Sequence, residues 1–348
     1  MDKLFSGFLI FIPAALIANY LHLSPLLIFF ISALSIVPLA KYIGEATDEL
    51  ATYSGPAFGG LLSATFGNAT ELIISIFAIR AGLIQVVKAS ITGSIIGNLL
   101  LVLGTAMFVG GIKFKKQEFN RTAAMASAST LLLTVIALVI PAIFLQTAPT
   151  AGSRIIEELS IVVSILLIII YIGNILFSLK THKHLYVEEV GKTEVKWSKT
   201  KSIIILLAST IAVAWMSEIL VGSIEPVVKN LGWTELFIGV IFVAIIGNAA
   251  EHVSAITMAV KNRMDLALQI SIGSATQIAI LIAPILVLVS LFFRNQMSLI
   301  FNPFELIAIV LSVMIANLIV EDGESNWLEG AQLLTAYIII AVAFFFHP

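Results

Sequence analysis

The chain has 348 residues, of which 59% are hydrophobic and 11% charged, and its formal net charge is −2. A soluble domain carries about 25% charged residues, so lipid must cover much of the surface of this protein. No basic excess is present to neutralise phosphates, which excludes a nucleic-acid binder. Cysteine is absent, which excludes disulfides and thiolate metal sites. Oxygen and imidazole remain as metal ligands, and a hard cation is favoured.

Eleven apolar segments come close to the length of about 20 residues that a helix needs to cross the hydrocarbon core. The first is expected to be retained rather than cleaved as a signal peptide, because its n-region, Asp2 and Lys3, is weak and a second apolar stretch follows Pro25. The sequence therefore predicts an all-α integral membrane protein with about 11 transmembrane helices. The segments cover residues 4–21, 25–41, 57–80, 85–110, 122–145, 157–180, 201–222, 235–260, 265–292, 303–320 and 328–346.

The distribution of positive charge predicts the orientation of these spans. With eleven spans, 14 of the 19 lysines and arginines fall on one side of the membrane and 5 on the other. Cytoplasmic loops are enriched in lysine and arginine, so we expect the N-terminus in the cytoplasm and the C-terminus outside, in a bacterial plasma membrane. Arg80 and Lys88 lie close to span ends, from which their long side chains can snorkel to the interface.

The sequence contains an internal repeat with an offset of 180 residues. Residues 67–72, Gly-Asn-Ala-Thr-Glu-Leu, match residues 247–252, Gly-Asn-Ala-Ala-Glu-His, and Gly93-Ser94 match Gly273-Ser274 at the same offset. Each copy holds five spans. Because five is odd, the second copy must enter the membrane from the opposite side, which gives inverted repeats related by an axis in the membrane plane.

This repeat divides the chain into four parts: an extra N-terminal helix (1–24), a first five-helix repeat (25–180), a cytoplasmic linker loop (181–200) and a second five-helix repeat (201–348). For the charged linker, a solvated loop is favoured over a regulatory cation sensor. Such a sensor would use His182, His184, Glu188 and Glu189.

Two glutamates, Glu71 and Glu251, lie inside apolar runs at equivalent positions of the repeats. A charged side chain at that depth costs about 2.5 to 3.5 kcal/mol on insertion scales. A single buried glutamate can be explained by an ion pair or by protonation. Two at repeat-equivalent positions, with no cationic residue at comparable depth, favour a functional site.

The residues around these glutamates predict a site rich in oxygen atoms. Gly67-Asn68 and Gly247-Asn248 lie one helical turn before Glu71 and Glu251, and these poor helix formers favour local unwinding that frees backbone carbonyls. The asparagines also share a helix face with the glutamates. The expected metal- and proton-binding residues are therefore Glu71, Glu251, Asn68, Asn248, Gly67 and Gly247. Polar residues of the next span in each repeat are expected to form the supporting wall: Ser94, Asn98, Ser274 and Gln277. His252 has no counterpart in the first copy, where Leu72 stands, and is interpreted either as a proton relay or as a packing histidine.

At these residues the sequence resembles the cation/proton exchanger family, the Ca²⁺/H⁺ antiporter branch of the Ca²⁺/cation antiporter superfamily. The first family motif resembles residues 59–73, and the second resembles residues 247–252 continuing through 259–265 to 273–279. The polar segment 44–50 also fits the family. The resemblance covers essentially the whole chain.

The resemblance implies one extra helix plus two inverted five-helix repeats, with Glu71 and Glu251 alternately protonated and bound to Ca²⁺. Two departures stand out. Ser63 occupies a position where the family typically has asparagine, and the linker, often acidic in relatives, carries six lysines and three glutamates. Cytosolic Ca²⁺ sensing by this linker is therefore not expected.

Charge counting then predicts the mechanism. One Ca²⁺ or two protons neutralise the two carboxylates, whereas the empty, doubly ionised site is too costly to carry across the hydrocarbon. This favours an alternating-access exchanger with Ca²⁺ and H⁺ as substrates, no cofactor and no enzymatic activity. The alternatives are exchange of Na⁺ for Ca²⁺ or of another divalent cation, a passive channel, and, more remotely, an intramembrane metal-dependent enzyme using Glu45, Asp48 and Glu49. The sequence leaves the oligomeric state open, a homo-oligomer included.

Overall fold

The computed structural model describes residues 7–148, 152–181 and 196–347. Its first half contains α2 (Phe11–Tyr20), α3 (Pro25–Phe66), α4 (Ala69–Ala81), α5 (Ile84–Ile96), the π-helical η1 (Gly97–Val102), α6 (Leu103–Phe114), β1 (Lys116–Glu118), α7 (Arg121–Thr147), α8 (Ser153–Leu176) and η2 (Phe177–Thr181). Its second half contains α9 (Lys199–Leu231), α10 (Glu235–Phe237), η4 (Ile238–Val243), α11 (Ala244–Gly247), α12 (Ala249–Val260), α13 (Met264–Gln277), η5 (Ile278–Ile282), α14 (Ala283–Ser290), α15 (Pro303–Ile319), β2 (Glu324–Asn326) and α16 (Trp327–Phe346).

The helices are those of a membrane protein. Within the described ranges, seven are long and apolar enough to span a bilayer, and the pair Glu235–Gly247 and Ala249–Val260, bent by 60°, makes an eighth. Two shorter apolar helices are α2 and α15. The expected all-helical membrane architecture is confirmed, whereas a count of 11 separate spanning helices is not.

The largest difference from the predicted spans lies in α3. The sequence predicts spans that end at 41 and begin at 57, but α3 continues from Pro25 through 42 residues to Phe66. The polar residues between the two predicted spans do not have to leave the membrane interior for water, because Lys41, Glu45 and Asp48 line a cavity.

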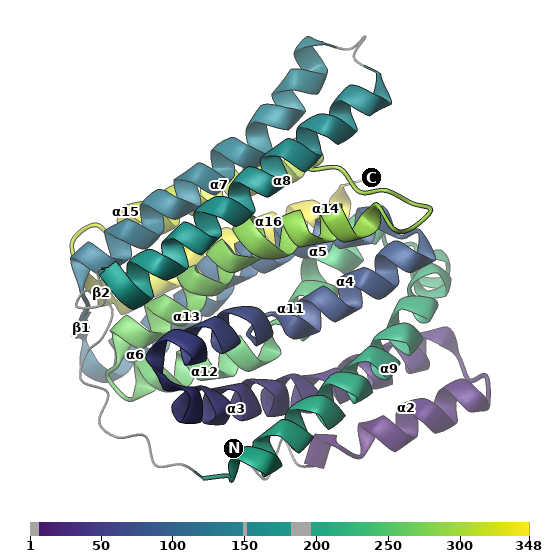
Figure 1. Ribbon diagram of the computed structural model, residues 1–348, viewed down its shortest axis with the longest axis horizontal. Coiled ribbons are helices and arrows are strands. Elements are labelled where there is room, and N and C mark those ends of the chain that lie inside the picture. The colour runs from purple at the N-terminus through teal and green to yellow at the C-terminus, as the bar shows by residue number, and fades with distance from the viewer. Residues whose placement is uncertain (1–6, 149–151, 182–195, 348) are drawn as a thin grey trace.

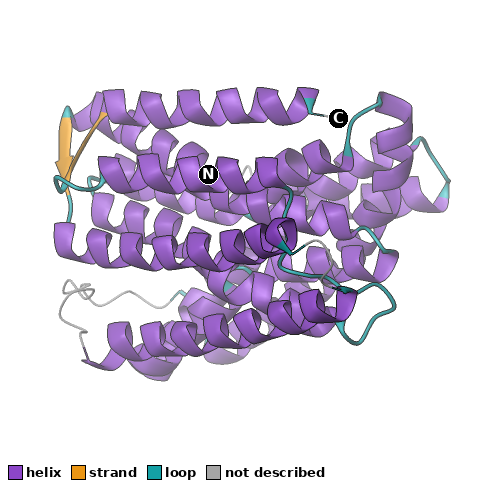
Figure 2. Cartoon of the chain, turned by 90° about the horizontal axis from the view of Figure 1, so that it is seen from above, coloured by secondary structure: helices purple, strands orange, loops and turns teal. Residues whose placement is uncertain are grey.

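The repeat is visible in the structure as paired elements. At the offset of 180 residues, α4 corresponds to α12, α5 to α13, and the π-helical η1 to η5. α4 ends beside the connection between α14 and α15, where a β-carbon on Gly82 would lie 2.9 Å from Nδ2 of Asn295. α12 ends beside β1, since Nε2 of Gln117 donates to the carbonyl of Ala259 at 2.9 Å. Figures 1 and 2 place the two-stranded β1–β2 sheet at one end of the helices and the C-terminus at the other. The paired helices therefore point in opposite directions.

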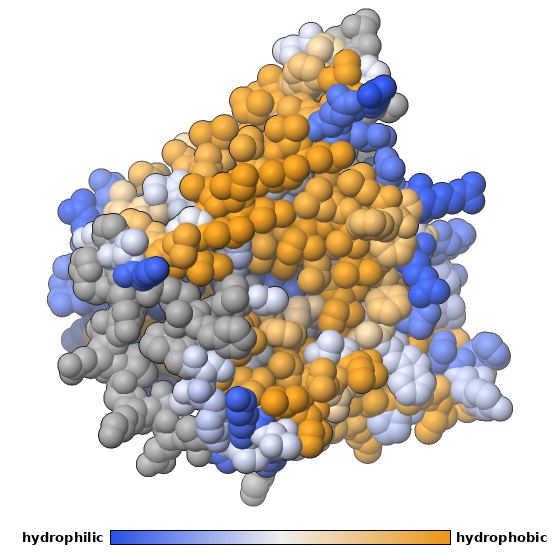
Figure 3. Space-filling model, viewed as in Figure 1, coloured by the Kyte–Doolittle hydropathy of each residue, from blue (hydrophilic) through white to orange (hydrophobic). Residues whose placement is uncertain are grey.

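The outer surface is suited to lipid. Figure 3 shows hydrophobic residues as a band across the middle of one face, with hydrophilic residues gathered at its left and right edges. Large apolar side chains such as Leu132 and Ile136 of α7 and Leu166 and Ile169 of α8 are 49 to 59% exposed. Such a contiguous apolar surface would aggregate in water and is stable only in contact with lipid.

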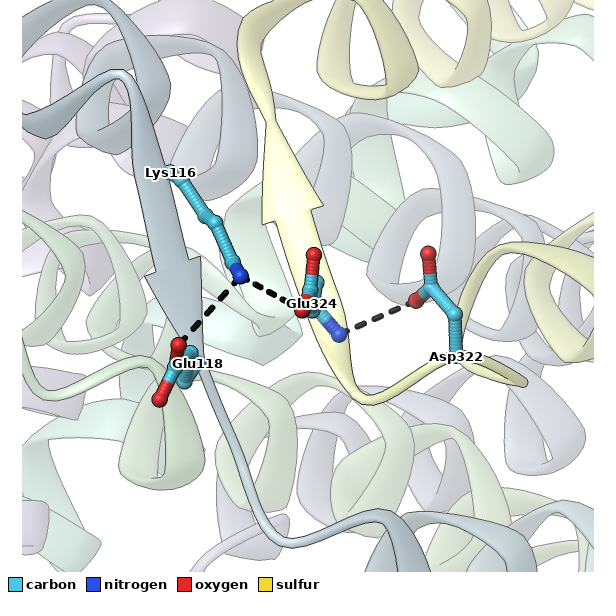
Figure 4. Close-up of polar contacts among 4 residues, drawn as sticks. All are labelled: Lys116, Glu118, Asp322 and Glu324. Atoms are coloured by element: carbon cyan, nitrogen blue, oxygen red, sulfur yellow. Dashed lines mark hydrogen bonds and ion pairs between the residues drawn. The ribbon is translucent and has the colours of Figure 1, made fainter.

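A two-stranded antiparallel sheet ties together two connections at one end of the molecule. β1 pairs with β2 in the register Lys116 with Asn326 and Glu118 with Glu324. Lys116 contacts the carboxylates of Glu118 and Glu324, and Asp322 accepts a hydrogen bond from the backbone of Glu324 (Figure 4). The β1–β2 sheet therefore joins the segment after α6 to the segment before α16. Of the predicted linker, residues 182–195 lie outside the described residues, and with them the four candidate sensor residues.

Candidate ion-binding site

Both predicted helix breaks are present. α3 ends at Phe66 and α4 begins at Ala69, with Gly67 and Asn68 between them and Asn68 in a non-helical conformation (φ −103°). In the second repeat, α11 ends at Gly247 and α12 begins at Ala249, with Asn248 between them (φ −92°). Glycine and asparagine lower the cost of leaving the helix at these points. The breaks place Glu71 and Glu251 in the first turns of α4 and α12.

The two repeats are joined at the breaks by reciprocal hydrogen bonds. Ser274 of the second repeat donates to Oδ1 of Asn68 in the first at 2.9 Å. Conversely, Nδ2 of Asn248 in the second repeat donates to the hydroxyl of Ser94 in the first at 2.8 Å. All four residues are at least 93% buried, so these bonds form away from water and fix the breaks relative to each other.

A second pair of amides completes this network. Nδ2 of Asn68 donates to Oε1 of Gln277 at 2.8 Å, and Nδ2 of Asn98 donates to Oδ1 of Asn248 at 2.9 Å. Asn98 lies in η1, and Gln277 is the last residue before η5. The structure thus brings together all the predicted amide and hydroxyl residues of the site.

Glu71 has a tight and apolar location. Its side chain is 4% exposed, and neither carboxyl oxygen has a hydrogen-bond partner among the described residues. A β-carbon built on Gly247 would lie 2.7 Å from Cγ and 3.2 Å from Cδ of Glu71. Only glycine at position 247 therefore leaves room for this carboxyl group, which explains why the second repeat needs glycine there.

Glu251 lies differently, at the wall of an open cavity of about 240 Å³. Its Oε2 also lacks a hydrogen-bond partner among the described residues, and its carboxylate is close enough to Glu71 for the two to repel each other electrostatically. Unpartnered carboxylates in a low-dielectric interior are costly unless a positive charge neutralises them. The pair is consequently poised to hold protons or a cation.

The cavity beside Glu251 is acidic. Lys41, Glu45 and Asp48 of α3 line it together with Ser63 and Gly67. No three histidine, aspartate or glutamate side chains in the described ranges cluster closely enough to hold a metal ion. A bound cation would therefore need amide, hydroxyl or backbone oxygens in addition to the two glutamates.

Glu49 does not join Glu45 and Asp48 in this cavity. Its carboxylate accepts hydrogen bonds from the backbone of Lys196 at 3.1 Å and of Trp197 at 3.4 Å. The enzyme alternative required these three carboxylates in one metal site, and the structure separates Glu49 from it. Glu45 instead pairs with Lys41 at 3.5 Å.

His252 stays outside the network. It is partly buried beside Glu251 in α12, and no residue in the described part of the chain provides a hydrogen-bond partner for its ring. Neither the proton-relay nor the packing interpretation gains a specific contact.

Lys88 is buried rather than snorkelling, contrary to the expectation for a span end. It is 8% exposed, and its amine donates to the carbonyl of Ile300 at 2.6 Å and to the hydroxyl of Ser298 at 3.3 Å. The segment before α15 folds over the end of α5 and supplies these oxygens. Thr92, one turn along α5, donates to the buried carboxylate of Glu305 at 3.1 Å. Sequence reasoning missed this cluster, although charged residues within apolar segments were its signal.

The fold and the site define a class of protein: an integral membrane protein in which two inverted repeats meet at a pair of broken helices that carry buried polar groups. The sequence matches the model of the sodium/calcium exchanger protein family over residues 24–180 and 201–346, and the chain belongs to that family.

Individual relatives are close. A Ca²⁺/H⁺ antiporter of Aphanothece halophytica is 48% identical over 365 aligned positions, covering all of this chain and 97% of the relative. The Ca²⁺/H⁺ antiporter ChaA of Bacillus subtilis is 46% identical over 340 positions, covering 96% of each. The structure of native YfkE superposes with a TM-score of 0.86 at 43% identity, covering 98% of this chain and all of that one. The crystal structure of the H⁺/Ca²⁺ exchanger CAX, at 16% identity, shares the fold with a TM-score of 0.70.

Proposed function

We propose that this chain is a secondary active transporter that exchanges cytosolic Ca²⁺ for external H⁺ by alternating access. The observation that carries the proposal is the pair of glutamates at the two helix breaks. Glu71 is buried and neither of its carboxyl oxygens has a hydrogen-bond donor among the described residues, while Glu251 is partly buried and its Oε2 lacks such a donor. Relatives covering nearly the whole chain at 46 to 48% identity are named Ca²⁺/H⁺ antiporters.

Charge balance gives the coupling. One Ca²⁺ or two protons neutralise the two carboxylates, and the empty ionised pair is too costly to cross the low-dielectric interior. Two protons moving down one pH unit release about 2.7 kcal/mol, enough to support a roughly hundredfold Ca²⁺ gradient. Ca²⁺ is cargo in this scheme, and the cycle requires no resident cofactor and no covalent chemistry.

The surrounding residues have separate roles in the proposal. Glu71 and Glu251 bind Ca²⁺ or protons, and the broken backbone at Gly67 and Gly247 supplies carbonyl oxygens. The side-chain oxygens of Asn68 and Asn248 already accept hydrogen bonds, so these asparagines fix the breaks in position. The supporting wall consists of Ser94, Asn98, Ser274 and Gln277.

Two further parts of the proposal concern organisation. The two five-helix repeats, 25–180 and 201–348, act as the halves that exchange access to the site. The end of the molecule that carries the β1–β2 sheet and Trp197 faces the cytoplasm of a bacterial plasma membrane, because most lysines and arginines lie in the connections at that end. The acidic cavity then opens toward cytosolic Ca²⁺.

The test is Ca²⁺ uptake into vesicles carrying the purified protein, under an imposed pH gradient or an imposed Na⁺ gradient, with internal pH recorded. We expect uptake driven by the pH gradient, matched by proton movement and insensitive to Na⁺. Uptake driven only by Na⁺ would retain the site but overturn H⁺ as the coupling ion. Ca²⁺ flux without proton counterflow would indicate a channel and contradict the proposal.

A further inference from the structure

Two cavities lie next to the site and share a lining residue of α3. The first is the acidic cavity described above, about 240 Å³, which contains Glu251. The second, about 250 Å³, lies between α7, α8 and α13, and we call it the neutral cavity. Ser63 of α3 lines both.

The walls of the two cavities differ in charge. The acidic cavity has the carboxylates of Glu45, Asp48 and Glu251. The neutral cavity presents hydroxyl and amide groups, and no lysine, arginine or carboxylate is among the described residues that line it. Its polar side chains belong to Ser63, Ser127, Thr130, Tyr171, Asn174, Ser178, Thr276 and Gln277.

Both cavities reach the same helix break. Gln277 lines the neutral cavity and accepts a hydrogen bond from Asn68 at 2.8 Å. Gly67 lines the acidic cavity, and its β-carbon position lies 3.8 Å from Oε1 of Gln277. The amide of Gln277 and the hydroxyl of Ser63 thus mark the point at which the cavities approach each other.

We propose that the neutral cavity is a separate water-filled route by which protons leave the site, while the cation enters through the acidic cavity. This inference rests on the function proposed above. Ca²⁺ requires several oxygen ligands and favours carboxylates, so the acidic wall attracts it and the neutral wall does not. A water molecule occupies about 30 Å³ of liquid, so the neutral cavity has room for several, and its hydroxyls and amides can order them.

Separate routes remove an electrostatic conflict. Protons leaving through the acidic cavity would meet an incoming dication and be repelled by it. A route lined by neutral groups avoids this encounter. Sharing one cavity would also leave its carboxylates to be protonated by each departing proton, which would weaken their attraction for Ca²⁺.

Ser63 is the connecting residue in this scheme. A hydroxyl can accept a proton from the protonated carboxyl of Glu251, directly or through one water, and give its own proton to water in the neutral cavity. Glu251 is left as a carboxylate that can bind Ca²⁺, and the transferred proton becomes part of the water chain. The cation/proton exchanger family, which the sequence resembles, typically has asparagine at this position. An asparagine cannot pass a proton in this way at ordinary pH.

The test separates the rate of exchange from the affinity for Ca²⁺. Thr130→Val removes a hydroxyl from the neutral cavity with almost no change of shape, and Ser63→Ala removes the connecting hydroxyl. Asp48→Asn removes one of the three carboxylates of the acidic cavity. Ser129→Val is the matched control, because Ser129 is exposed on the same helix as Thr130. Each protein is reconstituted, and Ca²⁺ uptake and internal pH are recorded at several Ca²⁺ concentrations in H₂O and D₂O.

We expect Ser63→Ala and Thr130→Val to lower the maximal rate about tenfold, to enlarge the solvent isotope effect, and to leave the half-saturating Ca²⁺ concentration unchanged. Asp48→Asn should raise the half-saturating concentration with little effect on the maximal rate. Thr130→Ser should restore the rate, and Ser129→Val should behave as the wild type.

Three outcomes would overturn the separate route. One is a shift of Ca²⁺ affinity in the neutral-cavity variants like that of Asp48→Asn, which would indicate one shared path. Another is an unchanged rate and isotope effect, which would mean that lipid or side-chain motion fills the neutral cavity. The third is loss of rate that Thr130→Ser does not restore. Failure of wild-type protein to couple Ca²⁺ to protons would instead contradict the proposed function itself.

Discussion

Glu71 of the first repeat lies directly against Gly247 of the second, with the β-carbon position of residue 247 only 2.7 Å from Cγ of the glutamate. The glutamate of one helix break therefore occupies the space that the missing side chain of the other break leaves free. This packing makes the position of one charged group depend on the backbone of the opposite repeat.

Gly247→Ala should abolish exchange, because its methyl group must displace the Glu71 side chain or the α11–α12 break. Ca²⁺ uptake by reconstituted protein measures the effect. Gly97→Ala is the control, since Gly97 is also buried but a β-carbon there meets no atom within 4 Å. Equal activity of the Gly247→Ala variant and the wild type would show that Glu71 is free to move away without consequence.

Glu71→Gln and Glu251→Gln should each abolish Ca²⁺ exchange while the protein still folds. The carboxamide mimics the protonated acid in shape but has no charge with which to bind a dication. Isothermal titration calorimetry measures Ca²⁺ binding, uptake into vesicles measures transport, and size-exclusion chromatography checks the fold. Retained Ca²⁺ transport in either variant would refute the assigned site.

Asn248→Ala should destabilise the folded protein by about 1 to 3 kcal/mol, because it removes the buried donor to Ser94 and leaves Nδ2 of Asn98 with only its 3.2 Å contact to Ser274. A double-mutant cycle with Ser94→Ala isolates the hydrogen bond between the two repeats. Unfolding in detergent by denaturant gives the four free energies. Strict additivity would mean that the hydrogen bond between Asn248 and Ser94 contributes nothing to stability.

Gln117→Leu should loosen the end of the helix that carries Glu251. The amide of Gln117 is 2% exposed and donates to Ala259 and to the side chain of Asn262, both at 2.9 Å. We expect faster amide hydrogen exchange at residues 259–263 and weaker Ca²⁺ binding. Unchanged amide hydrogen-exchange rates at these residues would show that β1 does not hold the end of α12.

Lys116 should titrate above the ordinary lysine value of 10.5, because hydrogen bonds to Glu324 and Glu118 raise its pKa. A raised pKa means that this contact stabilises the β1–β2 sheet at neutral pH and that the stabilisation is lost as pH rises through the folded-state pKa. NMR titration of the lysine side chain should show a lower pKa in Glu324→Gln. Because the contact is exposed, added salt should weaken it.

The sequence was sufficient for the features that follow from local chemistry and from the repeat. Gly-Asn pairs one turn before Glu71 and Glu251 predicted both helix breaks, since glycine and asparagine are poor helix formers. The pair alone is not sufficient, because Gly97-Asn98 and Gly173-Asn174 lie within continuous helix. The 180-residue offset predicted which polar residues share the site. The reciprocal pairing of Ser274 with Asn68 and of Asn248 with Ser94 could not be predicted, because it depends on how closely two distant helices approach.

Features that depend on tertiary coverage were missed. Lys88 near a span end has the pattern of a snorkelling residue, and only the segment that folds over it supplies the oxygens that keep it buried. The neutral cavity is built from three helices whose hydroxyls are, one by one, ordinary residues of membrane helices. A single hydroxyl in a span predicts nothing until the neighbouring helices are placed.

The crossed hydrogen bonds at the two breaks also constrain how the protein is assembled during synthesis. When the first repeat has entered the membrane, Asn68 has no Ser274 or Gln277 to bond with, and Ser94 and Asn98 have no Asn248. Each half alone carries polar groups that only the other half can satisfy, so the first half must wait with its broken helix hydrated or held by the insertion machinery until the last spans arrive. Expressed separately, neither half should be a stable protein, whereas the two halves expressed together should associate and recover the site.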